Sequence, residues 1–144
     1  MGITECGPYK SFSNGDLETF KGVFDSKEEN FQFFFENRKL RRIGIYLYEG
    51  NDPAAGARKW RTLYSTLSRL YGRIESPDNL PPLTGDADVV AFESKAKELV
   101  QSSGKVQMAP LAQPDGASVF SNFWRREATG QTFYFVVLYF DKRQ

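Results

Sequence analysis

The sequence predicts an α+β fold in which a twisted antiparallel sheet of about five strands, including two hairpins, packs against two helices that lie mainly on one face. Aromatic residues, which favour strands, make up 15% of the 144 residues. Some segments alternate apolar and polar residues, and others repeat apolar residues at helical spacing. The length is that of one domain, so we expect a flexible tail over residues 1–17 and a single domain over residues 18–144.

The first hairpin is predicted between residues 31 and 48, after a short strand over 19–24 and a polar turn over 25–30. Its odd-numbered apolar residues are expected on one face: Phe31, Phe33, Phe35, Ile43, Ile45 and Leu47. A three-residue loop over 37–39 places Phe33 opposite Ile43, whereas a two-residue loop places it opposite Arg42. Burial therefore favours the longer loop.

Two helices are predicted after this hairpin. The first begins with the capping pair Asp52-Pro53 and ends at Gly72, and it carries a full apolar stripe. A long loop rich in proline follows over residues 76–86. The second helix runs from Asp86 or Asp88 to about residue 103. We expect Val89, Phe92, Ala96 and Leu99 to face inward and a Glu93–Lys97 pair to face solvent.

The C-terminal part predicts a short edge strand over 106–111 and a second hairpin, with strands over 119–127 and 132–141. In its last strand, the odd-numbered and the even-numbered residues from Phe133 to Phe140 are all apolar. Such a strand is expected at the centre of a sheet with both faces covered. If one face is left uncovered, we expect that face to be an interface.

Composition removes several kinds of chemistry. The chain contains no His and a single Cys, Cys6, so it has no histidine base, no intramolecular disulfide and no cysteine-based zinc site. Asp86 and Asp88 are interpreted as residues that open a helix rather than as metal ligands. We predict a protein that is not an enzyme, with no catalytic residues, metal site or cofactor. A carboxylate enzyme would require two or more acids to converge in a cleft.

Charge is concentrated in the middle of the chain, although the net charge is only +1. Residues 38–73 hold nine basic and two acidic residues. Arg41, Arg42, Arg58 and Arg61 are candidate ligands for an anionic lipid, a phosphate or a nucleic acid. The alternative interpretation is that these side chains only keep a hairpin and a helix soluble. The absence of a nucleic-acid module signature disfavours nucleic acid as a partner.

The sequence predicts no transmembrane span, because its longest apolar run is eight residues and a membrane helix needs about 20. The first six residues match a myristoylation signal and a lipoprotein cleavage box only in part. A plain tail is the simpler interpretation. These residues show no signal peptide, so Met1 is either the natural start or the replacement of a removed leader.

Packing residues between about 20 and 140 resemble a pattern found in uncharacterised bacterial secreted or lipoprotein-type domains. The likeness is carried by residues 33–40, 43–47 and 60–72, and by Trp124 with the last strand. The resemblance implies an α+β fold and a periplasmic or cell-envelope location. It transfers no functional residues.

We therefore predict a non-enzymatic interaction module that binds a protein or an apolar partner through an exposed aromatic surface. Phe34, Tyr46 and Tyr48 are the candidate surface residues. An anion-binding domain that uses the four arginines is the alternative. The oligomeric state is left open.

Overall fold

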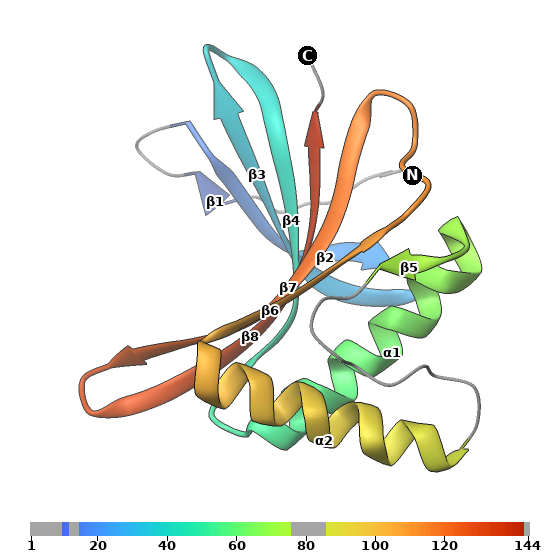
Figure 1. Ribbon diagram of the computed structural model, residues 1–144. Coiled ribbons are helices and arrows are strands. Elements are labelled where there is room, and N and C mark those ends of the chain that lie inside the picture. The colour runs from blue at the N-terminus through green and yellow to red at the C-terminus, as the bar shows by residue number, and fades with distance from the viewer. Residues whose placement is uncertain (1–9, 12–14, 76–85, 143–144) are drawn as a thin grey trace.

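The protein is built on one antiparallel sheet that carries both helices on the same side (Figure 1). The computed structural model describes residues 10–11, 15–75 and 86–142. The strands are β1 (Lys10–Ser11), β2 (Leu17–Phe24), β3 (Lys27–Glu36), β4 (Lys39–Gly50), β5 (Ile74–Glu75), β6 (Lys105–Pro110), β7 (Ala117–Ala128) and β8 (Gln131–Lys142). The helices are α1 (Pro53–Tyr71) and α2 (Asp86–Ser103). The α+β class is thus confirmed.

The sheet has eight strands in the order β1-β2-β3-β4-β8-β7-β6-β5, so the expected number of about five is too low. Two of the additional strands, β1 and β5, are only two residues long. They owe their strand geometry to pairing with β2 and β6, and two residues are too few to carry a periodic signal. Part of the expected tail, Lys10–Ser11, is therefore paired with β2. The rest of the tail before residue 15 and the loop at 76–85 lie outside the described residues.

Three hairpins close through two-residue turns. Both central residues have the positive φ that a type I′ turn requires: Asp25 and Ser26, Asn37 and Arg38, and Thr129 and Gly130. The polar turn expected over residues 25–30 is therefore wrong, because residues 27–30 belong to β3. These residues are polar because the strand continues beyond the apolar core.

The β3–β4 hairpin corrects the predicted loop and confirms the predicted register. The loop has two residues, with Glu36 paired to Lys39. An extra residue on β4, Arg41, forms a β-bulge that shifts the register, so that Phe33 still faces Ile43. Burial thus decided the pairing, but the chain achieved it with a tight turn and a bulge rather than with a longer loop.

The β8 strand lies at the centre of the sheet between β4 and β7, as predicted, but the helices cover only one of its faces, so the expected cover on both faces is wrong. Its residues 134–138 are all buried. Val136 and Leu138 pack into the core beneath the helices. Phe135 and Val137 alternate with them and point to the other side of the sheet, outside that core cluster.

Helix α1 has the predicted bounds. The Asp52 side chain accepts a hydrogen bond of 3.0 Å from the Ala54 amide, and Gly72 ends the helix at φ 82°. Ala57, Trp60, Leu63 and Leu67 of its apolar stripe are buried. Gly56 lets the helix approach β7, since a Cβ there would lie 2.7 Å from the Phe123 ring.

Helix α2 packs on α1 through the stacked rings of Trp60 and Phe92, whose centroids are 5.8 Å apart. Phe92 and Ala96 are buried as expected, and Val100 completes the buried row, while Val89 and Leu99 are only half-buried. The predicted Glu93–Lys97 pair is wrong, because Glu93 binds Arg61 of α1 at 2.8 Å. Neither helix, within the described part of the chain, is long and apolar enough to cross a membrane.

Candidate functional site

The side of the sheet that neither helix covers (Figure 1) carries a set of large rings that we call the aromatic face. Each ring is adjacent in its strand to a residue that points into the core. Because successive side chains of a strand point to opposite faces, the rings lie on the side away from the core. The aromatic face consists of Phe34, Tyr46, Phe120, Trp124, Phe135 and Tyr139. Except for the buried Phe135, these side chains are half-buried. In the described part of the chain no helix lies over them.

Two stacked pairs give the aromatic face a fixed shape. Trp124 and Phe135 face each other in the β7–β8 register and stack at 4.3 Å with an angle of 16°. Phe120 and Tyr139 face each other in the same register and stack at 5.2 Å. Such pairs contribute about 0.5–1.5 kcal/mol beyond the area they bury. The rings therefore form a preorganised surface.

An arginine extends the second stack. The Arg42 guanidinium lies 4.8 Å from the Tyr139 ring centroid and 5.7 Å from that of Phe120. Its Nε and Nη2 donate to the two carboxylate oxygens of Asp141 at 2.5 and 2.9 Å. The bidentate pair holds the guanidinium plane and neutralises its charge. Arg42 therefore acts here as a flat, partly apolar surface group.

The tyrosine hydroxyls of the aromatic face are hydrogen-bonded to each other. Burial, together with the hydrogen bond that Tyr46 makes to Tyr139, raises the pKa of Tyr46 well above its ordinary value of 10. Burial also raises the pKa of Tyr139. Both hydroxyls stay neutral at physiological pH, so they offer hydrogen bonds rather than a phenolate base.

Between the two stacks lies a pair without aromatic rings, Asn122 on β7 and Val137 on β8. Val137 is fully buried although no helix packs on its side of the sheet in the described chain. The Asn122 Oδ1 is buried and accepts no hydrogen bond from the residues that the structure describes. A buried acceptor without a donor costs about 1–3 kcal/mol.

The β2 strand adds exposed apolar side chains to the same side. Thr19 and Gly22 both face the core, and a bulge between them turns the intervening residues outward. Phe20 is 67% exposed and Val23 is 58% exposed. These two residues border the aromatic face beyond β3.

Two of the three residues predicted to form a partner surface lie together. Phe34 and Tyr46 meet over Gly44, whose missing side chain leaves space between their rings. Tyr48 points to the other side of the sheet, because a bulge after Tyr46 places Tyr48 opposite Val136. Its hydroxyl bonds to the amide and the carbonyl of Asp52 at the start of α1.

The four predicted arginines do not form one site. Arg41 and Arg42 lie on β4, where Arg41 donates to the Lys142 carbonyl at 2.7 Å. Arg58 and Arg61 lie on α1, against the opposite side of the sheet from Arg42, and Arg61 is paired with Glu93. Sequence proximity grouped these residues, whereas the fold separates them and gives most of them a partner.

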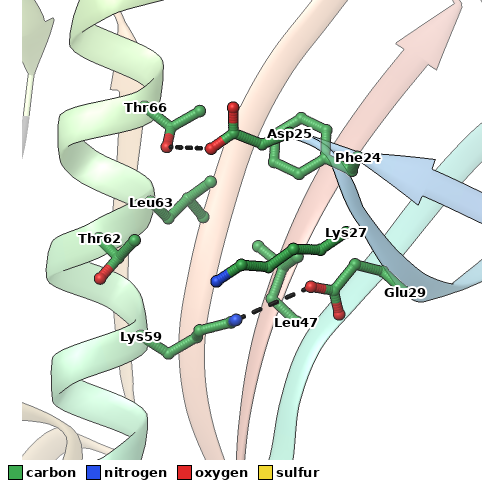
Figure 2. Close-up of a pocket in the computed structure, with 9 residues that line it drawn as sticks. All are labelled: Phe24, Asp25, Lys27, Glu29, Leu47, Lys59, Thr62, Leu63 and Thr66. Atoms are coloured by element: carbon green, nitrogen blue, oxygen red, sulfur yellow. Dashed lines mark hydrogen bonds and ion pairs between the residues drawn. The ribbon is translucent and has the colours of Figure 1, made fainter.

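A small pocket lies between α1 and the tip of the β2–β3 hairpin, with two carboxylates and two lysines around it (Figure 2). Lys59 Nζ lies 3.7 Å from Glu29 Oε1, and the Thr66 hydroxyl donates to Asp25 at 3.3 Å. Burial raises the pKa of Glu29 even though Lys59 is close. The pocket volume is about 40 Å³, which is room for roughly one water molecule. We interpret these contacts as a polar link between the hairpin and α1.

Among the residues that the structure describes, no three acidic or Cys side chains gather in a way that could hold a metal ion. The rings of β7 and β8 are the surface residues that sequence reasoning left out. Their signal was present in the two-sided apolar pattern of β8. What was missing was the knowledge of which face of β8 the helices leave uncovered.

Comparisons with protein-family models, with curated proteins and with solved structures found no match for this chain.

Proposed function

We propose that the protein is a non-catalytic interaction module that binds a protein partner through the aromatic face. The observation that carries the proposal is an ordered layer of stacked rings on the side of the sheet that the helices leave open. The occupant we expect is an apolar protein surface with little charge.

The composition of the aromatic face favours a protein over a polyanion. Interface centres are rich in Tyr, Trp, Phe and Arg and poor in unpaired charges, and energetic hot spots are enriched in Trp, Tyr and Arg. The guanidinium that lies on these rings, Arg42, is neutralised by Asp141. Nucleic acid would require several cations along the rings to meet its phosphates.

Site-specific photo-crosslinking tests the proposal. A photoreactive phenylalanine analogue replaces Phe34 on the aromatic face or, as a matched control, Leu70, which is 52% exposed on α1. In extract from the native cells we expect a crosslinked protein from position 34 and none from position 70. The captured protein is then purified and titrated against the unmodified chain.

Affinity then decides the role of the rings. Phe34→Ala and Trp124→Ala are expected to weaken binding at least tenfold, as truncated hot-spot residues do, whereas Leu70→Ala leaves it unchanged. Circular dichroism confirms that each variant is folded. A purified partner that binds both ring variants as tightly as the original chain would refute the proposal.

The proposal also places this contact in the bacterial cell envelope, on the strength of the resemblance to secreted and lipoprotein-type domains. Fractionation of the native cells tests this part separately. Recovery of the chain only in the cytosolic fraction would contradict the location and leave the aromatic face as proposed.

A further inference from the structure

A groove of about 320 Å³ opens at the end of the sheet where β4 begins and β8 ends. We call it the end groove. Its apolar lining comes from Leu40, Ile43, Ala117 and Phe140, and its cationic lining includes Arg41 and Lys142. No helix residue lines it. The volume lies at the lower end of the range of about 300–1,000 Å³ that is typical of small-molecule sites.

The floor of the end groove is formed by apolar side chains at the edge of the core, where the core is not fully covered. Ile43 faces Phe140 across the β4–β8 register, and both side chains are partly buried and pack against the core cluster. Leu40 at the edge is 37% exposed. The groove therefore offers apolar area that the chain itself leaves partly in water, next to side chains that the core already holds in place.

The rim of the end groove is positively charged. Arg41 is oriented by its 2.7 Å hydrogen bond to the Lys142 carbonyl, and its contact with the exposed Glu36 is a looser 3.5 Å. Arg42 is neutralised by Asp141. Within the described residues, no carboxylate lies within ion-pair distance of the Lys142 amine. Among the described lining residues, Lys142 and Arg41 are thus the cations that can bind an anion here.

Apolar floor and cationic rim together define the ligand. We propose that the end groove binds a small amphiphile with one anionic head group and a short apolar tail, of which a medium-chain monocarboxylate is the simplest example. The head would meet Lys142 and Arg41, and the tail would cover Ile43 and Phe140. Each buried methylene of such a tail raises the affinity roughly fourfold, so the tail supplies most of the affinity.

This site is independent of the proposed protein contact. Ile43 and Phe140 point to the helix side of the sheet, whereas the aromatic face lies on the other side. It also replaces the four-arginine anion site by a smaller one that uses Arg41 and a residue that the sequence did not indicate, Lys142. Failure of either proposal leaves the other standing.

An NMR titration of the full chain tests the inference with three probes. Sodium octanoate carries head and tail, sodium acetate only the head, and octanol only the tail. We expect octanoate to give saturable shifts of the Gly116, Ala117 and Lys142 amides and to bind at least fivefold more tightly than either fragment. Acetate binding as well as octanoate would mean a simple anion site, and octanol binding as well would mean an apolar cleft; either result overturns the proposal.

Variants separate the contributions of head and tail. Lys142→Gln is expected to weaken octanoate binding about twofold to fivefold, in line with the loss of an exposed charge pair. The control Arg58→Gln makes the same charge change on α1 and is expected to have no effect. Ala117→Leu should fill the floor and abolish saturable binding. If octanoate gives no saturable shifts, or if the two charge variants behave alike, the end groove is not the site.

Discussion

Two glycines in the sheet provide a test of which side of it is tightly packed. A Cβ added at Gly22 of β2 would lie 2.4 Å from the Phe31 ring, and Phe31 is fully buried. A Cβ added at Gly44 of β4 would lie 3.4 Å from the rings of Phe34 and Tyr139, which is ordinary contact. Neither glycine has a positive φ, so alanine tests packing rather than backbone strain.

The expected magnitudes follow from two opposing terms. Glycine to alanine reduces the freedom of the unfolded chain and stabilises by about 0.4–1 kcal/mol where the backbone allows it. Forcing a methyl group into a filled core costs about 1–3 kcal/mol. At Gly22 the second effect is larger, because the buried Phe31 ring has no free space to move into. We expect Gly22→Ala to lose about 1–2 kcal/mol and Gly44→Ala to be neutral or slightly stabilised.

Urea denaturation followed by tryptophan fluorescence measures both variants. The free energy of unfolding is compared at equal m-value, so that a change reports stability rather than a different unfolded state. If Gly22→Ala were as stable as the original chain, the close contact with Phe31 would be wrong. If Gly44→Ala lost as much as Gly22→Ala, the aromatic face would be as closely packed as the core, and its role as a docking surface would lose its basis.

Three further predictions concern single contacts. Asp52→Ala removes the cap of α1 and should cost about 1 kcal/mol in urea denaturation, whereas Asp52→Ser should restore most of it. Burial raises the pKa of Glu29 above its ordinary 4.5, so the folded protein holds this proton more tightly than the unfolded chain does. The resulting stability is present below pH 4.5 and is lost as the pH rises through the raised pKa; Glu29→Gln should flatten that decline, and an unchanged pH profile would contradict the assignment. A double-mutant cycle on Arg61 and Glu93 should give a coupling of about 0.5–1 kcal/mol, and additive single changes would show that this pair does not join the helices.

The helices could be predicted from the sequence because their signals are local. The Asp52-Pro53 start and the Gly72 end are read within a few residues, and they do not depend on what the helix packs against. The apolar stripe through Trp60 identifies the buried side in the same way. The partner of Glu93 could not be predicted, because it depends on how α2 crosses α1.

The candidate surface was only partly predictable for the same reason. The sequence grouped Tyr48 with Phe34 and Tyr46, and the structure keeps only Phe34 and Tyr46 together, so the placement of Tyr48 is wrong. The β-bulge after Tyr46 reverses which side of the sheet the following residues face, and no residue type at that position indicates a bulge. The rings that complete the aromatic face come from β7 and β8, far along the chain.

By itself the sequence determined the α+β class, the helix ends, the central position of β8 and the pairing of Phe33 with Ile43. The helix ends follow from capping residues in short stretches of chain, and the other features follow from strong apolar patterns. Only the tertiary structure decided which face of β8 the two helices leave open. It also decided that bulges redirect Arg41 and Tyr48, and that Lys142 borders a groove with β4. These features depend on contacts between distant segments, whose geometry no local pattern encodes. They are also the features on which both proposed binding sites rest.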